Sequence, residues 1–214
     1  MSETLLACLQ RLAGQHVAVG VSDVGSEQGL LDPEPLAVTR AISKRRTEFA
    51  AGRRAARMAL TAADLPEVAI PQGRNRAPVW PTGVVGSISH DQRLAVAVVA
   101  RSQSMSRLGI DIADASPFPK HLRDEILRTS AERALSGIDA RLSFSAKETV
   151  FKAFYPEVQR YFGFGAVEIT PNLSGEHFTV TLREPLGSAP NASTFEGRAA
   201  IVGEHLVTIL AIPA

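Results

Sequence analysis

The longest helical pattern in the sequence runs from Leu36 to roughly Ala63, and it constrains the fold more than any other feature. Pro35 stands just before it and Pro66 just after it. At about 100° per residue, its apolar side chains fall on one stripe: Val38, Ile42, Phe49, Ala56 and Leu60. A helix with a single apolar stripe has to bury that stripe against other elements, so the flanking segments must supply a core.

The flanking segments are mostly extended. β-Branched and alternating patterns predict strands at 16–21, 84–88, 94–100, 108–112, 166–170, 178–182 and 198–212, the last with a turn at 203–204. Further helices are predicted at 120–136 and from Phe144 to Tyr155, where Pro156 ends the pattern. Strands with a long helix thus occur twice, which predicts an α+β fold of two halves, 1–105 and 106–214, joined at the Ser-rich stretch 102–106. No repeat of individual residues is visible between them.

Composition excludes several classes of protein. Lys and Arg number 23 against 22 Asp and Glu, so bulk charge does not call for a polyanionic partner such as nucleic acid. Cys8 is the only cysteine, which excludes an internal disulfide and a multi-thiolate zinc site and fits the cytoplasm. No apolar run approaches the roughly 20 residues of a membrane span, and the start lacks the pattern of a signal peptide. We therefore expect a soluble cytoplasmic protein.

Arginines border the apolar stripe of the long helix. Arg46, Arg53 and Arg57 lie on one flank and Arg45 lies on the other. They could form a solvated face whose stems cover apolar surface. Guanidinium groups beside a core stripe could also hold a phosphate at the rim of a cleft, which makes Arg45 and Arg53 candidates.

A second candidate lies where the strand Gly86-Ser87-Ile88-Ser89-His90 ends. Small residues let backbone N–H groups approach an anion, and His90 adds a donor when it is protonated. The spacing is not that of a nucleophile elbow. A histidine at a turn can also be a simple polar residue with its hydrogen bonds satisfied, so this corner alone decides nothing.

Two carboxylates stand beside apolar residues. Asp111 lies inside the strand Gly109-Ile110-Asp111-Ile112, where its charge is costly unless a cation or hydrogen-bond donors compensate it. Mg²⁺ is one such cation, because it binds carboxylate oxygens together with substrate phosphates. Glu148 borders the buried face of the second long helix. Ser145 three residues earlier completes a capping-box pattern, so Glu148 could instead cap that helix.

Two lysines flank Glu148. Lys147 in the first turn of a helix opposes the helix macrodipole by roughly 0.3–1 kcal/mol, a cost that a bound phosphate would reverse. Lys152 lies four residues after Glu148, so it could pair with that carboxylate or reach the same anion.

Taken together, these segments resemble the 4'-phosphopantetheinyl transferase superfamily, in the single-chain, pseudo-dimeric type associated with surfactin and enterobactin. The resemblance rests on motifs that occur in the right order over roughly residues 40–170: Lys44-Arg45-Arg46-x-x-Phe49-x-x-Gly52-Arg53, Arg76 before Pro78-Val79-Trp80-Pro81, Gly86-Ser87-Ile88-Ser89-His90, Gly109-Ile110-Asp111-Ile112, and Phe144-Ser145-Ala146-Lys147-Glu148-x-x-x-Lys152. Each motif alone is weak, and the ordered set is specific.

The resemblance implies a pseudo-twofold fold of two similar halves, each with a small antiparallel sheet packed on a long helix, and an active site in the cleft between them. It implies that a monomer transfers 4'-phosphopantetheine from coenzyme A to a serine of an apo acyl or peptidyl carrier protein, as in siderophore, polyketide or nonribosomal peptide synthesis. Arg45, Arg53, Arg76, Ser89 and His90 would hold the nucleotide and its 3'-phosphate. Lys147 and Lys152 would contact the pyrophosphate, and Asp111 and Glu148 would bind Mg²⁺ or Mn²⁺, with Glu148 as the base.

The sequence departs from the family at Ala113, where a third metal-binding carboxylate is common. Alternation along a strand puts residue 113 on the face of Asp111 and Asp114 on the opposite face, so Asp114 does not replace it unless a bulge shifts the register. This departure leaves a second hypothesis, a catalytically weak module that binds coenzyme A or a carrier protein. A nucleic-acid binder that uses the arginine-rich helix is a third, and the small net charge disfavours it.

Overall fold

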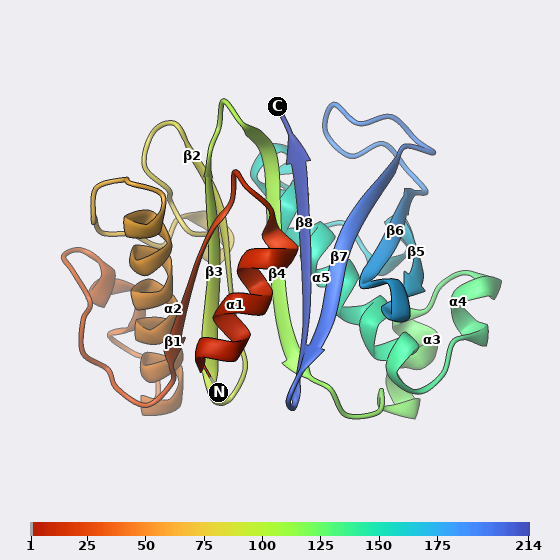
Figure 1. Cartoon of the computed structure of the whole chain (residues 1–214), viewed down its shortest axis with the longest axis horizontal. Coiled ribbons are helices and arrows are strands. Elements are labelled where there is room, and N and C mark those ends of the chain that lie inside the picture. The colour runs from red at the N-terminus through yellow and green to blue at the C-terminus, as the bar shows by residue number, and fades with distance from the viewer. Residues whose placement is uncertain (1) are drawn as a thin grey trace.

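The chain forms two antiparallel sheets with helices on both sides (Figure 1). The computed structural model describes residues 2–214, so Met1, the first residue of the predicted N-terminal half, lies outside the described residues. The helices are α1 (Ser2–Ala13), α2 (Ser43–Ala62), α3 (Arg123–Ile126), α4 (Ser130–Ala134) and α5 (Gly137–Val158). The strands are β1 (Ala18–Asp23), β2 (Val84–His90), β3 (Leu94–Arg101), β4 (Met105–Asp114), β5 (Val167–Asn172), β6 (His177–Leu182), β7 (Thr194–Val202) and β8 (His205–Pro213).

Strand order follows the same scheme in both sheets. The first sheet has the order β1-β3-β2 and the second the order β4-β8-β7-β6-β5, with antiparallel pairing throughout. In the first sheet β1 is followed by the long helix α2 and the hairpin of β2 and β3, and β3 pairs with β1. In the second sheet β4 is followed by α5 and later by the hairpin of β7 and β8, and β8 pairs with β4. The structure thus confirms an α+β fold with a sheet and a long helix in each part.

The central strand β3 is buried on both faces because different helices cover them. Its residues Val96 and Val98 belong to a core that α1 closes, whereas Ala95 and Ala97 belong to the core under α2. Alternate side chains of a strand point to opposite faces, which explains this division. The core under α1 also contains Leu108, Ile110 and Ile112 of β4 together with Val207 and Ile209 of β8, so it spans both sheets.

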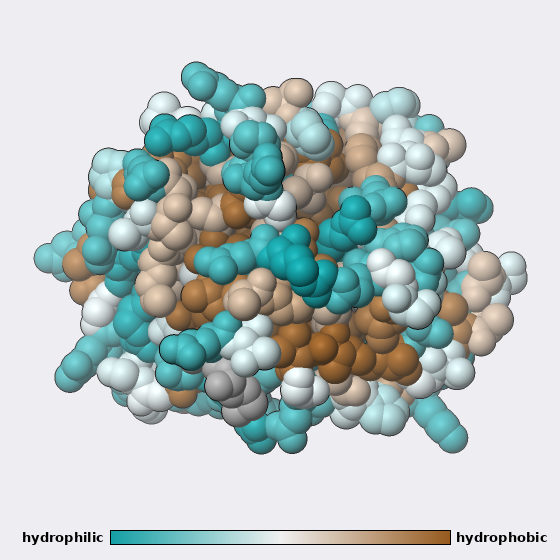
Figure 2. Space-filling view, in the orientation of Figure 1, coloured by the Kyte–Doolittle hydropathy of each residue, from teal (hydrophilic) through white to brown (hydrophobic). Residues whose placement is uncertain are grey.

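Helix α5 covers the other face of the second sheet. Leu142, Ala146, Val150 and Phe154 of α5 pack against apolar residues of β5 to β8. Helix α1 crosses the opposite side, in front of both sheets in Figure 1, and Figure 2 shows hydrophilic side chains over the middle of this face with apolar areas beside them. Over residues 2–214, no helix has the length and apolar character needed to cross a membrane.

A glycine brings each long helix close to its first strand. A Cβ added at Gly20 of β1 would lie 2.0 Å from the carbonyl oxygen of Ala55 in α2. At Gly109 of β4 the corresponding distance is 2.1 Å, to the carbonyl oxygen of Thr149 in α5. Both glycines thus serve close packing of a helix backbone on a strand, and the two halves share this feature residue for residue.

A buried glutamate repeats in the same way. Glu34 pairs with Arg57 of α2 and accepts a hydrogen bond from the backbone N–H of Ile70, at 2.7 Å. Glu132 pairs with Lys147 of α5 and accepts one from the backbone N–H of Ile169, at 2.9 Å. Each carboxylate ties the chain before a long helix to the chain after it. The sequence did not reveal this repeat.

Several predicted boundaries were wrong. The helix predicted to start at Leu36 begins at Ser43, because Ile42 is extended (ψ 157°) and a separate 3₁₀ turn, Glu34–Val38, precedes it. The helix predicted from Phe144 begins at Gly137, and Pro156 lies within its last turn and does not end it. The region predicted as one helix, 120–136, consists of a 3₁₀ turn, Lys120–Leu122, followed by the two short helices α3 and α4.

Replacing Gly109 by alanine tests the close packing of α5 on β4. The new methyl group would overlap the backbone oxygen of Thr149, which cannot move without shifting the helix, so we expect a loss of about 1–3 kcal/mol in the free energy of unfolding. Urea denaturation measures it. Gly25→Ala is the matched control, because nothing lies within 4 Å of a Cβ there. Equal stability of the two variants would contradict this account.

Candidate active site at the junction of the two sheets

Strands β2 and β4 lie next to each other across the junction of the sheets and are joined by serine side chains. The backbone N–H of Ile110 donates to Ser87 Oγ at 3.2 Å, and that of Ile112 donates to Ser89 Oγ at 3.4 Å. Residues 87 and 89 point to the same side of β2 because they alternate along the strand. This arrangement places Ser89 next to Asp111, which lies between Ile110 and Ile112 on β4.

Asp111 is almost fully buried and is compensated by three side chains. Ser89 Oγ and Lys152 Nζ donate to its Oδ1 at 2.8 and 2.7 Å, and Ser145 Oγ donates to its Oδ2 at 2.8 Å. Lys152 also donates to Ser89 Oγ and to the carbonyl of Ile110. The sequence predicted that a carboxylate in this strand needs hydrogen-bond donors or a cation. The structure confirms this prediction, because Lys152 of α5 and two serines compensate Asp111.

Glu148 stands one helical turn before Lys152 on α5 and lines the same cavity as Lys152. Burial raises the pKa of its carboxyl group, Lys152 opposes that rise, and the charge of Asp111 adds to it. The capping-box interpretation of Ser145 and Glu148 was wrong. Both residues lie inside α5, which begins at Gly137, and Ser145 bonds Asp111.

Lys147 does not join this group. Its ammonium is fully buried, pairs with Glu132 at 2.9 Å, and donates to the carbonyls of Ile126, Phe164 and Val167. Burial lowers its pKa and Glu132 opposes that effect. The argument that Lys147 opposes the helix macrodipole also fails, because residue 147 is remote from the first turn of α5. Lys147 therefore holds α5 to the loops beside it, and the predicted contact with pyrophosphate finds no support.

A second polar group lies at the end of β2. Arg45 Nη1 of α2 is 3.0 Å from His90 Nε2, and the Glu48 carboxylate is 3.7 Å from Arg45 and 4.0 Å from His90. A guanidinium can only donate, so Nε2 accepts and the ring is neutral. The pKa of His90 is lowered mainly by burial, with Glu48 and a backbone hydrogen bond at Asp91 opposing and with Arg45 and Lys152 contributing.

Arg53 lies deeper than predicted. Its guanidinium stacks on the Phe49 ring at 3.9 Å, and its Nε donates to the carbonyl of Ile70 at 2.9 Å. Burial is the main cause that lowers its pKa to about 10, with Arg45 and Arg57 adding to the effect and Glu34 opposing it. Its buried Nη2 has no hydrogen-bond partner among residues 2–214. One nitrogen of this guanidinium is therefore buried without a hydrogen bond, while the rest of the group is held by Phe49 and Ile70.

A cavity of ≈ 790 Å³ lies between residues 75–88 of the first part of the chain and α5 of the second. One wall comes from residues 75–88, including Arg76 and Ser87, and the other from α5, including Glu148, Lys152 and Tyr155. Asn75 and Arg76 have left-handed backbone conformations (φ 53° and 66°), and the Asn75 side chain donates to the Tyr155 hydroxyl. This bond holds the loop with Arg76 against α5. The sequence reasoning missed both Asn75 and Tyr155.

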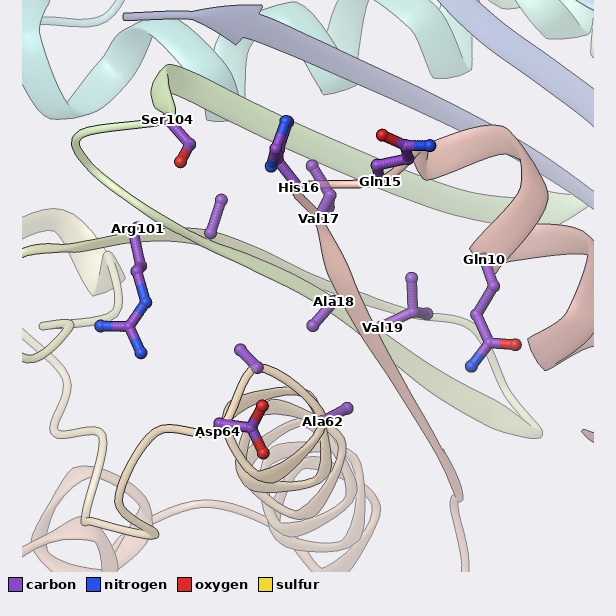
Figure 3. Close-up of a pocket in the computed structure, with 12 residues that line it drawn as sticks. Gln10, Gln15, His16, Val17, Ala18, Val19, Ala62, Asp64, Arg101 and Ser104 are labelled. Atoms are coloured by element: carbon purple, nitrogen blue, oxygen red, sulfur yellow. The ribbon is translucent and has the colours of Figure 1, made fainter.

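Another depression with a polar lining lies elsewhere. It measures ≈ 320 Å³ and is bordered by Gln10, Gln15, His16, Arg101 and Ser104, which Figure 3 shows around the start of β1, the end of α2 and the turn after β3. None of the predicted site residues lines it. Of the predicted site residues, Arg76, Glu148 and Lys152 line the cavity between β2 and α5, and Arg45 and His90 form a separate polar group.

The donor set fits a hard divalent cation. Within the described residues no group of three or more His, Cys, Asp or Glu side chains is arranged to hold a metal ion. Asp111 and Glu148 would be two ligands from the protein, and Ala113 adds none. Mg²⁺ typically takes one or two protein carboxylates and completes its shell with phosphate oxygens and water. Burial is the main cause of the raised pKa of Glu148, and a cation between the two carboxylates would offset the repulsion from Asp111 that adds to it.

Comparison with known proteins gives the same family in both parts of the chain. Residues 32–100 match the 4'-phosphopantetheinyl transferase N-terminal domain, and residues 107–210 match the 4'-phosphopantetheinyl transferase superfamily. The chain is 38% identical over 196 residues to 4'-phosphopantetheinyl transferase Svp of Streptomyces mobaraensis, covering 86% of this chain and 80% of that protein.

Two further relatives are matched over shorter stretches. 4'-phosphopantetheinyl transferase PptT of Mycobacterium tuberculosis is 35% identical over 147 residues, 65% of this chain and 64% of its own length. Enterobactin synthase component D of Escherichia coli K12 is 38% identical over 130 residues, 56% and 59% respectively. The chain belongs to the 4'-phosphopantetheinyl transferase superfamily.

Replacing Glu132 by alanine tests whether Lys147 has a structural role. The variant leaves a buried ammonium without its counter-ion, so we expect the free energy of unfolding to fall by about 3–5 kcal/mol in chemical denaturation. Glu204→Ala is the control, because it breaks an ion pair with Arg93 that is well exposed and should change little. A loss as small as that of the control would mean that Lys147 does not depend on Glu132.

Proposed function

We propose that the group of Asp111, Glu148 and Lys152 transfers 4'-phosphopantetheine to a carrier protein, with the diphosphate of coenzyme A lying in the cavity between β2 and α5. Membership of the superfamily gives the activity: the 4'-phosphopantetheine group passes from coenzyme A to a carrier protein. The observation that carries the proposal is that Lys152, which bonds Asp111, lines together with Glu148 a cavity large enough for a ligand.

Two positive regions would receive the two ends of the nucleotide. Arg45 and His90 form the first, where an anion could replace His90 Nε2 as the acceptor for Arg45 and receive a further charge-assisted bond from the protonated ring. Arg53, which lies on the same helix as Arg45, adds a further positive charge close to this region. Arg76 faces the cavity from the loop that Asn75 and Tyr155 hold in place.

Lys152 provides the second region. In the structure its ammonium neutralises Asp111, and in the complex it would turn to the diphosphate while Asp111 and Glu148 bind Mg²⁺. When bound, Mg²⁺ supplies the charge that neutralises the diphosphate oxygens as they become more negative. Water and phosphate oxygens would occupy the position that a carboxylate at residue 113 holds in other members of the family.

The reaction then needs a nucleophile from the partner and a base from this chain. The carrier serine oxygen attacks the phosphorus that bears the pantetheine arm, a new P–O bond forms, and the P–O bond to adenosine 3',5'-bisphosphate breaks. Glu148 accepts the serine proton, directly or through water.

Both parts of the site come from one chain, with residues 1–105 supplying the nucleotide side and residues 106–214 the metal side, so we propose that a monomer is sufficient. Coenzyme A as substrate and Cys8, which is free, agree with a cytoplasmic location. Acyl and peptidyl carrier domains share the serine chemistry, and the site favours neither.

Glu148→Gln tests the proposed base. The amide keeps the shape and cannot accept the proton, so we expect kcat to fall by about 100-fold or more. The assay follows the added mass of phosphopantetheine on an apo-carrier protein in the presence of coenzyme A and Mg²⁺. Glu125→Gln, at an exposed position of α3, is the control. Nearly normal transfer by the Glu148 variant would remove it from the reaction. A wild-type chain that binds coenzyme A but modifies none of several carriers, and gains activity on Ala113→Glu, would favour the weak binding module.

His90 makes coenzyme A binding depend on pH. Its pKa is lowered in the free protein, mainly by burial, and would be raised by the bound phosphate. When the pH lies above the pKa of the free protein, binding therefore takes up a proton. Affinity should therefore weaken as pH rises from the lowered pKa of His90 in the free protein to its higher pKa in the complex, by up to about tenfold per pH unit in that interval. Isothermal titration of coenzyme A at several pH values, in buffers with different ionisation enthalpies, measures both affinity and proton uptake. His90→Gln should abolish the uptake, and an unchanged pH dependence would contradict the assignment.

A further inference from the structure

Three buried hydroxyl groups stand in a row behind Asp111. Ser145 Oγ on α5 is 2.8 Å from Asp111 Oδ2 and 2.9 Å from Thr208 Oγ1 on β8. Thr208 Oγ1 is in turn 2.7 Å from Thr149 Oγ1, one turn further along α5. All three residues have no exposed surface. The row links the carboxylate to α5 and to β8, and β8 contributes no other residue to the proposed reaction.

Proton counting gives this row a direction. A carboxylate can only accept, so the single hydroxyl proton of Ser145 goes to Asp111. Ser145 must then accept from Thr208, and Thr208, having given its proton, must accept from Thr149. The alternative acceptor for Thr149, the backbone carbonyl of Thr208, lies further away at 3.3 Å. The three O–H dipoles therefore all point toward Asp111, an arrangement in which each bond strengthens the next.

We infer that Ser145 and Thr208 are positioning residues, which fix the Asp111 carboxylate so that Oδ2 stays bonded to the interior and Oδ1 is presented to the cation. The inference rests on the proposed function, in which Asp111 binds Mg²⁺. Oδ1 is the oxygen that Lys152 and Ser89 contact, and Lys152 lines the cavity. Restricting the carboxylate before the metal binds lowers the entropic cost of binding.

The row matters more in this chain because residue 113 is alanine. With two protein carboxylates in place of three, metal affinity depends more strongly on how well each one is held. Partners behind a metal ligand typically contribute about 10- to 100-fold in metal affinity or activity when they are removed. The serine and threonines supply that support without adding charge to a buried position.

A pair of substitutions at Thr208 separates positioning from simple packing. Thr208→Val keeps the shape of the side chain and removes the hydroxyl, whereas Thr208→Ser keeps the hydroxyl and loses a methyl group. The melting temperature of the protein with saturating coenzyme A, followed as Mg²⁺ is titrated, gives the midpoint of metal binding without any turnover. The Mg²⁺ dependence of kcat is measured in parallel.

We expect Thr208→Val and Ser145→Ala to raise the Mg²⁺ midpoint by about tenfold and Thr208→Ser to leave it near the wild-type value. Asp111→Asn is the reference, because it removes the ligand itself. If Asp111→Asn raises the midpoint and the hydroxyl variants lower only the melting temperature of the metal-free protein, the inference is overturned and the proposed function stands. If Asp111→Asn leaves the midpoint and the activity unchanged, the proposed function fails as well.

Discussion

The hydrogen bonds of Ser89 and Asp111 across the junction of the two sheets are the interactions on which the site depends. β2 and β4 meet through serine side chains that receive backbone N–H groups of β4, and this places a buried carboxylate next to the end of β2. Lys152 then reaches the same point from α5 and offsets the cost of burying that charge. The groups at Arg45 and at Glu148 come from opposite sides of this junction, so any shift of one sheet against the other would separate them.

In both halves a long helix packs closely on a strand at a glycine, and the halves differ at the residues next to these contacts. Gly20 and Gly109 each admit the backbone of a long helix, and the residues placed equivalently to Asp111 and Glu148 in the first half are Ser22 and Arg54. There Arg54 donates to Ser22 Oγ at 3.1 Å and to nearby carbonyls. At these equivalent positions the acidic pair thus occurs only in the second half, and in the proposed function the first half holds the nucleotide.

The sequence predicted the strands and selected Asp111, Glu148 and Lys152 for one site, because these depend on local alternation or on an ordered motif. It did not predict that Lys152 pairs with Asp111. It failed for Lys147, since its role depends on where α5 begins, seven residues earlier than the apolar pattern indicates, and on Glu132, which is distant in the chain. Thr129 and Glu132 do form a capping box, which the sequence could have signalled. The ion pair of Lys147, the hydrogen bond between Asn75 and Tyr155 and the row of hydroxyl groups behind Asp111 are all tertiary contacts, and no local sequence pattern contains them.

Helix α1 has a consequence for how the chain can be divided. Leu5, Leu9 and Leu12 close a core to which strands of both sheets contribute, so neither sheet can complete its own interior without the other. Cutting the chain at the turn between β3 and β4 would leave two fragments with exposed apolar faces, which would need to be produced together to avoid aggregation. The chain ends also lie at opposite edges of this face in Figure 1, so a circular permutant would require a linker that crosses the whole molecule.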